Sequence, residues 1–199
     1  MEITEVQRDV LQEIGNIGIG HAATSLSGLL MHRIDISVPK VWILPFEEVA
    51  AIMGELDALK ATVFLRVLGE APGKALFFFP IDTAESIVQS LLCTQEKIDF
   101  NADEMARSAL DEVGNIMVSS FLMALSQFSG VSLRPSVPAL AVDMVGATLN
   151  EVFLEEGGSG HNAVLFVDTQ LSGTPKIEGQ FLFLPQEGSL EKLFGALGL

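Results

Sequence analysis

The chain has 199 residues, of which 49% are hydrophobic, so it is long enough and apolar enough to bury a core. Its net charge is −15 and its 11 Lys and Arg residues are scattered, which disfavours nucleic acid and anionic membrane surfaces as partners. No apolar run reaches the ~18 residues that span a bilayer, and residues 1–9 lack a signal-peptide pattern, so we expect a cytoplasmic protein.

In chain order, the first half opens with apolar residues at helical spacing, including Val6, Val10 and Ile14. An alternating strand, two strands around a Gly- and Pro-containing turn, and an amphipathic helix follow. The predicted elements are a helix at 3–30, a strand at 33–38, a hairpin of 62–68 and 74–79, and a helix at 82–92.

The second half repeats this order. Asp103 is the expected N-cap of its long helix. The segment 142–152 is ambiguous, and we interpret it as helical. The other predicted elements are a helix at 102–130, strands at 132–136, 163–171 and 177–184, and a helix at 188–197.

The two halves are related in sequence at an offset of 99 residues. Residues 13–17 (EIGNI) align with 112–116 (EVGNI), and the Ser-Val-Pro at 37–39 is identical to that at 136–138. We therefore expect a single domain over 1–199, made of two repeats at about 1–101 and 102–199. The predicted fold class is α/β (α+β): two homologous halves related by a pseudo-two-fold, sharing a mostly antiparallel sheet packed with long helices.

Each long helix carries a polar triad at the same spacing. The triads are Asp9, Glu13 and Asn16 in the first half, and Ser108, Glu112 and Asn115 in the second. At about 100° per residue, the second side chain lies ~40° to one side of the first and the third ~20° to the other. Each triad thus forms a narrow stripe that a partner can reach. The simpler interpretation, a solvated helix face, applies to most such stripes.

Two features favour a functional interpretation. Asn is a poor helix former, yet it occupies the same interior position of both helices. A glycine, Gly15 or Gly114, precedes it each time, although an interior Gly costs a helix about 1 kcal/mol relative to Ala. We infer that some other group comes close to the backbone there.

The chemistry of Glu and Asn suits phosphoryl transfer. A carboxamide is no general base near neutral pH, but it donates and accepts hydrogen bonds at once and can hold a water in line with phosphorus. A carboxylate can pair with a lysine of a partner and fix the register of docking. The candidate catalytic residues are Glu13, Asn16, Glu112 and Asn115.

These residues resemble the motif of the CheC/CheX/FliY family of chemotaxis phosphatases: Asp or Ser, three residues, Glu, two residues, Asn, twenty-two residues, Pro. The motif ends at Pro39 in the first half and at Pro138 in the second. With two complete motifs and no additional domain, the chain resembles the CheC branch of this family. The resemblance implies a phosphatase acting on the aspartyl-phosphate of CheY, with Glu meeting a CheY lysine and Asn positioning water.

The resemblance also implies partners and cofactors. The protein is expected to need no cofactor of its own, because the Mg²⁺ belongs to the CheY site. It is expected to bind CheD, a receptor deamidase, near the ambiguous second-half segment. The candidate CheD-binding residues are Val142, Asp143, Met144 and Val145.

Two other functions stay open at this point. One is a non-catalytic adaptor that binds CheD or a response regulator, and the other is a metal-dependent hydrolase with its own cation. The three histidines lack the spacing of metal ligands, so no metal site is predicted. Cys93, beside an apolar helix, is expected in the core and not as a nucleophile.

Overall fold

The computed structural model describes residues 4–36, 40–54, 56–155 and 163–199. Within them the same order of elements occurs twice: a long helix, two short strands, a helix, a long hairpin and a closing helix. The first half contains α1 (Glu5–Leu30), β1 (Ile34–Ile36), β2 (Lys40–Pro45), α2 (Phe46–Met53), β3 (Leu59–Gly69), β4 (Gly73–Pro80) and α3 (Ile81–Leu92).

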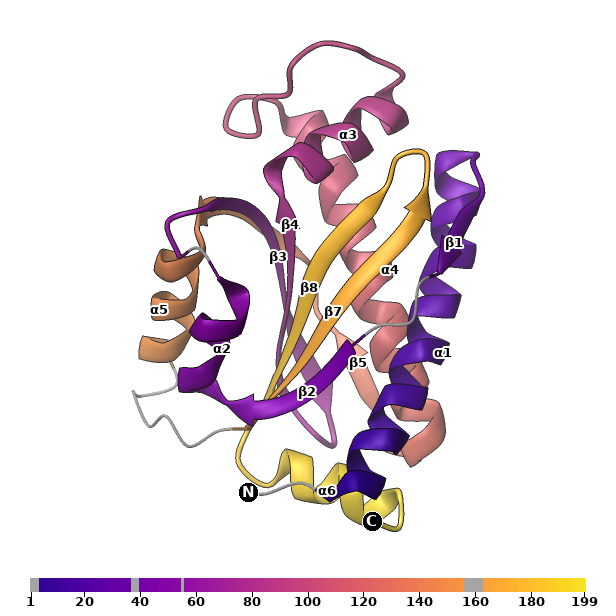
Figure 1. The fold of residues 1–199 in the computed structure, drawn as a ribbon, viewed down its shortest axis with the longest axis vertical. Helices are drawn as coiled ribbons and strands as arrows, with labels where there is room; N and C mark the ends of the chain where they lie inside the picture. Colours follow the sequence, from indigo (N-terminus) through magenta and orange to yellow (C-terminus); the bar gives the residue numbers. More distant parts are fainter. Residues whose placement is uncertain (1–3, 37–39, 55, 156–162) are drawn as a thin grey trace.

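The second half repeats this order from the other long helix onward (Figure 1). Its elements are α4 (Glu104–Ser129), β5 (Leu133–Pro135), β6 (Ala139–Met144), α5 (Val145–Glu155), β7 (Ala163–Gly173), β8 (Ile177–Pro185) and α6 (Ser189–Ala196). No helix of the described part is both long and apolar enough to cross a bilayer.

All the strand pairs are antiparallel, in the order β1-β7-β8-β4-β3-β5, with β2 also on β7 and β6 also on β3. The short strands of each half thus pair with the hairpin of the other half. The equivalent residues Ile34 and Leu133 face Gly173 and Gly69, respectively, at the two edges. The halves therefore interlock around an axis between β4 and β8, which confirms the predicted fold class.

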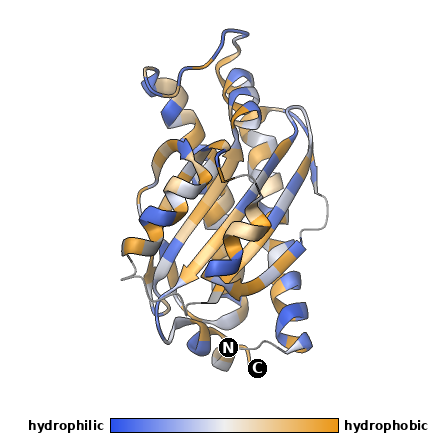
Figure 2. Cartoon of the chain, turned by 60° about the vertical axis from the view of Figure 1, so that its left-hand side comes forward, coloured by the Kyte–Doolittle hydropathy of each residue, from blue (hydrophilic) through white to orange (hydrophobic). Residues whose placement is uncertain are grey.

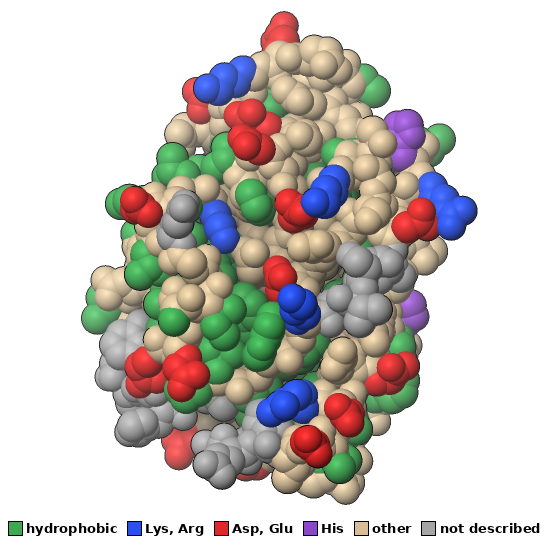
Figure 3. Space-filling model, in the orientation of Figure 1, with side chains coloured by type: hydrophobic (Ala, Val, Ile, Leu, Met, Phe, Trp, Pro, Cys, Tyr) green, Lys and Arg blue, Asp and Glu red, His purple; other side chains and the backbone are tan. Residues whose placement is uncertain are grey.

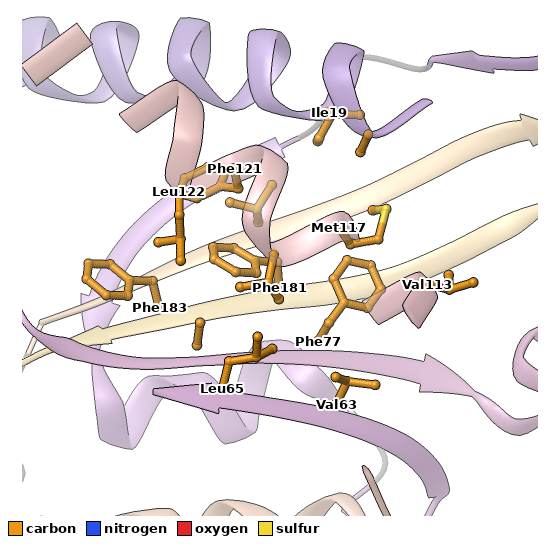
Figure 4. Close-up of a cluster of buried hydrophobic side chains, with 14 of the residues drawn as sticks. Ile19, Val63, Leu65, Phe77, Val113, Met117, Phe121, Leu122, Phe181 and Phe183 are labelled. Carbon is orange, nitrogen blue, oxygen red and sulfur yellow. The ribbon is translucent and has the colours of Figure 1, made fainter. Parts of the chain in front are cut away.

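Helices cover both faces of the curled sheet. Figures 1 and 2 place α1, α3 and α4 on one side and α2 and α5 on the other, with hydrophobic residues along the strands between them. Alternation along β3 divides its side chains, so that Val63 and Leu65 join the core under α1 and α4 while Phe64 packs against the core under α2 and α5. Figure 4 shows Val63, Leu65 and Phe77 facing the side chains of α4.

Two close approaches fix the long helices in place. An added Cβ on Gly18 would lie 2.9 Å from Cα of Phe121, so α1 and α4 meet backbone to backbone there. An added Cβ on Gly114 would lie 2.5 Å from Cβ of Val63, so α4 also meets β3 closely. The inference that another group approaches the backbone at Gly114 is confirmed, and that group is a core strand of this chain.

Most of the predicted elements are present within a few residues of their expected bounds. Three elements were missed, β2, α2 and β6. The segment 142–152, which was interpreted as helical, begins in β6 and continues as α5. The expectation that Cys93 is buried is wrong. This residue ends α3 in the left-handed conformation, with φ of 51°, and its side chain is exposed.

Candidate functional site

The start of each long helix is fixed by a capping residue at the same position of the repeat. In α1 the backbone N–H of Gln7 donates to Oγ1 of Thr4 (3.2 Å), and Oε1 of Gln7 accepts from the N–H of Thr4 (3.0 Å). In α4 the N–H of Ala106 donates to Oδ1 of Asp103 (3.0 Å). Equivalent caps give the two helices the same phase, so equivalent residues point in equivalent directions.

The triads lie where the periodicity predicted. Both glutamates and both first triad residues are exposed, and both asparagines are half-buried. Beneath them, Ile14 and Val113 are sealed in the core, and Val10, Ile17 and Ile116 pack against its edge. A partner can therefore reach each carboxylate and carboxamide without displacing any core side chain. The exposed residues are Asp9, Glu13, Ser108 and Glu112; the half-buried ones are Asn16 and Asn115.

A hydrogen bond orients the carboxamide of the second triad. Oγ of Ser119 donates to Oδ1 of Asn115 at 3.2 Å, in a partly buried setting. The first half has Gly20 at the corresponding position, which has no side chain to make such a bond. The sequence signal, a hydroxyl four residues after the Asn on one helix face, was overlooked.

A second carboxylate lies beside Glu112. Asp111 is half-buried, and its Oδ1 has no hydrogen-bond partner among the described residues. Burial raises the pKa of this carboxyl, and the nearby Arg107 guanidinium opposes that rise. Arg107 itself donates to the carbonyls of Phe100 (2.9 Å) and Leu140 (2.7 Å), so it ties α4 to β6. The first half has neutral Gln12 in place of Asp111 but charged Asp9 in place of Ser108, so the two sites carry equal numbers of carboxylates at different positions.

The motif prolines are only partly described. Pro138 is half-buried in the connection between β5 and β6, and Pro39 lies outside the described residues. The segment before Pro138 is held on β3, because the N–H of Ser136 donates to the carbonyl of Arg66 (2.8 Å) and Oγ of Ser136 accepts from the N–H of Arg66 (2.9 Å). This proline thus follows an anchored segment at the edge of the sheet.

The four candidate CheD residues do not share one environment. Asp143 and Met144 are exposed at the end of β6, and Val142 is half-buried against the main core. Val145, the first residue of α5, is completely buried in the core under α2 and α5, so its expected place on the surface is wrong. It points inward because β6 passes directly into the amphipathic helix there.

Charges on the surface are mixed. Figure 3 shows acidic and basic side chains interspersed over the face seen in Figure 1. Among the described residues, no group of three or more His, Cys, Asp or Glu side chains is arranged to hold a metal ion. What the described triads offer is therefore carboxylate and carboxamide groups presented to a partner.

Comparison with known proteins relates both triads to one family. A model described as the CheC-like family matches the chain twice, at residues 6–43 and 105–142. The CheY-P phosphatase CheC of Bacillus subtilis (strain 168) is 38% identical over 201 residues, which cover 98% of this chain and 96% of the relative. Each matched segment contains one complete triad and its proline.

Solved structures share the fold at lower identity. FliY from Thermotoga maritima superposes with a TM-score of 0.78 at 22% identity, covering 100% of this chain and 98% of that one. A chain from the complex of CheX with CheY, beryllofluoride and Mg²⁺ from Borrelia burgdorferi gives 0.53 at 19% identity, covering 86% of this chain and 97% of that one. The repeated architecture is thus common to these proteins.

Proposed function

The chain belongs to the CheC-like family, and we propose that it is a phosphatase that hydrolyses the aspartyl-phosphate of the chemotaxis response regulator CheY. The observation that carries this proposal is the pair of equivalent triads, each reachable from outside on a helix that is fixed to the core. The 38% identity to the Bacillus subtilis protein, a CheY-P phosphatase, supports the same reaction for this chain. The proposal places the reaction in the cytoplasm, where we expect the regulator to be.

We assign one role to each member of the pair. Glu13 or Glu112 pairs with a lysine of CheY and fixes the register of docking. Asn16 or Asn115 holds a water in line with the phosphorus, donating or accepting through its carboxamide. The flanking Asp9 and Ser108 would line the same stripe and set its local charge.

The reaction then needs little covalent work from this chain. The oxygen of the held water attacks phosphorus, the bond between phosphorus and the aspartyl oxygen breaks, and the carboxylate leaves with the electron pair. The proton of the water passes to phosphate or solvent, so the products are inorganic phosphate and free CheY. Positioning supplies most of the acceleration. The Mg²⁺ that neutralises the phosphoryl charge belongs to CheY in this proposal, and the protein brings no cofactor.

The test is phosphate release from phosphorylated CheY with variants of the two asparagines. We expect Asn16→Ala and Asn115→Ala each to remove the contribution of one site, and the double variant to return the rate to that of CheY alone. Asn150→Ala, which removes an exposed helical asparagine of α5, is the matched control and should leave the rate unchanged.

Continued acceleration by the double variant would exclude the proposed mechanism. A double variant that still binds CheY but no longer hydrolyses would separate catalysis from the adaptor function. Stripping metal from this protein alone, before CheY and Mg²⁺ are added, should not change the rate; a loss would support a metal-dependent hydrolase.

We further propose that CheD binds at the corner between β6 and α5. Asp143 and Met144 are exposed there, and Met144 pairs with the exposed Leu59 of β3. An apolar pair beside an acid offers both contact area and register to a protein partner. Met144→Lys should weaken CheD binding at least tenfold in a titration. The control is Leu68→Lys, which changes an exposed apolar residue of β3 at the end where this strand pairs with β5, and it should not weaken binding. Equal effects of the two changes would refute this surface.

A further inference from the structure

Each triad is preceded on its helix by an exposed apolar residue at the same position of the repeat. Val6 is 60% exposed and Met105 is 67% exposed, and they are related by the same offset of 99 residues as the triads. Single exposed apolar residues are ordinary on protein surfaces. Their occurrence at equivalent positions in both halves, next to the triads, calls for a shared explanation.

The helix places these residues in line with the glutamates. Val6 stands seven residues before Glu13, and Met105 stands seven residues before Glu112. Seven residues make nearly two turns, so each pair shares one side of its helix with a difference of only about 20° and a separation of roughly 10 Å along the axis. A partner that reaches the glutamate from outside would cover the apolar residue with the same surface.

The second half has a hollow at this place. A shallow, open depression at the start of α4 is lined by Ala102, Asp103, Glu104, Met105 and Ser108. Ser108 is also the first residue of the triad, so the depression is continuous with the candidate site. Two of its lining residues are acidic and one is a flexible, polarisable methionine, a side chain that adapts to varied apolar contacts.

From this continuity, and resting on the proposed function, we propose that Val6 and Met105 form a second contact with the phosphorylated response regulator. An apolar side chain of the regulator packs on Met105 in the depression, and a neighbouring lysine or arginine faces Glu104. Val6 and Glu5 offer the same contact in the first half with less apolar surface. The two residues therefore set affinity for the regulator, while the asparagines set the rate of the chemical step.

The test uses a protein with one working site. In the Asn16→Ala background, Met105→Ser should raise KM for phosphorylated CheY about tenfold and leave kcat within about twofold, because it removes apolar contact without touching the reacting atoms. The matched control is Met123→Ser, another exposed methionine of α4, whose first-half equivalent is Thr24 and which lies outside the depression. In the Asn115→Ala background, Val6→Ser should raise KM by about threefold.

An unchanged KM for Met105→Ser, an equal effect of Met123→Ser, or a fall in kcat alone would overturn the inference. If the single-site parent proteins do not hydrolyse phosphorylated CheY at all, the proposed function fails, and the surface is then tested by binding. In a titration with CheY loaded with beryllofluoride and Mg²⁺, Met105→Ser should raise the dissociation constant of one of the two sites about tenfold, and Met123→Ser should change neither. The absence of that difference would overturn the docking surface by itself.

Discussion

Oγ of Ser119 donates a 3.2 Å hydrogen bond to Oδ1 of Asn115, one helical turn before it. This bond uses one of the two acceptor positions of the carboxamide oxygen and restricts the rotation of the side chain. In the first half Gly20 stands where Ser119 would be, so the carboxamide of Asn16 receives no such bond from the corresponding position. The two sites therefore differ in how firmly the carboxamide is held.

The first prediction concerns this bond. In the Asn16→Ala background, where only the second site works, Ser119→Ala should lower kcat about fivefold and change KM little. A neutral hydrogen bond contributes about 1 kcal/mol, and its loss lets the carboxamide rotate away from the geometry that holds the water. Single-turnover phosphate release from phosphorylated CheY measures the effect.

The control for this prediction is the same substitution in the Asn115→Ala background. There only the first site works, and Ser119→Ala should leave its rate unchanged. A similar loss of rate in both backgrounds would mean that Ser119 acts through the stability of α4 and does not orient the carboxamide.

Local periodicity was enough to predict the long helices and the hairpins, because each of these segments carries its own pattern of buried side chains. The missed strand β2 has four consecutive apolar residues, 41–44, and so short a run does not distinguish strand from helix. Its pairing partner is β7, more than a hundred residues away, and β6 likewise pairs with β3 of the other half. Only the interlocking of the halves shows that these segments are strands.

The outward orientation of the triads could be predicted, since angular position on a helix follows from residue spacing alone. The environment of Asp111 could not, because it depends on Arg107 and on where β6 passes α4. The exposure of Cys93 was missed for a similar reason, as an apolar neighbourhood in sequence said nothing about the left-handed turn that ends α3.

The second prediction concerns Gly114, the glycine that precedes Asn115. Gly114→Ala should destabilise the protein by about 2–3 kcal/mol, because the added Cβ would lie 2.5 Å from two side-chain atoms of Val63. The change should also shift α4 and so slow the second site. Urea unfolding gives the loss of stability, and phosphate release in the Asn16→Ala background gives the loss of rate.

Gly28→Ala is the matched control for that substitution. Gly28 lies in α1 with nothing within 4 Å of its added Cβ, so alanine should stabilise the protein by about 0.5–1 kcal/mol through helix propensity. Combining Gly114→Ala with Val63→Gly should cost less than the sum of the two single changes, because glycine at position 63 removes the Cβ and both Cγ atoms that the new methyl group would meet. If the two losses of stability were additive, the close approach of α4 to β3 would not be the cause of the destabilisation by Gly114→Ala.

The third prediction follows from the raised pKa of Asp111, which burial causes. The folded protein binds the proton of the Asp111 carboxyl more tightly than the unfolded chain does. The ionised carboxylate therefore destabilises the fold, and this destabilisation is complete at pH values above the folded pKa. It disappears as the pH falls through the folded pKa to below the ordinary pKa of 3.8. Asp111→Asn should therefore raise the free energy of unfolding at pH 7.

The advantage of Asp111→Asn should shrink as the pH approaches 4, which denaturant unfolding at several pH values can follow. Asp57→Asn, a change at an exposed carboxylate, corrects for the altered net charge of an acidic protein. If both variants raised the free energy of unfolding equally, general charge repulsion and not the burial of Asp111 would explain the result.

The fourth prediction concerns the left-handed residue that ends α3. Cys93 has a φ of 51° and its N–H donates to the carbonyl of Gln89, a helix-ending arrangement that glycine adopts without steric cost. Cys93→Gly should therefore raise the free energy of unfolding by about 0.5–1 kcal/mol, measured by urea unfolding under reducing conditions. Cys93→Ala removes the thiol equally but keeps a Cβ, so it should bring no such gain. If alanine stabilised the protein as much as glycine, removal of the thiol and not relief at φ would be responsible, and the conformation of this turn would carry no energetic penalty for a side chain.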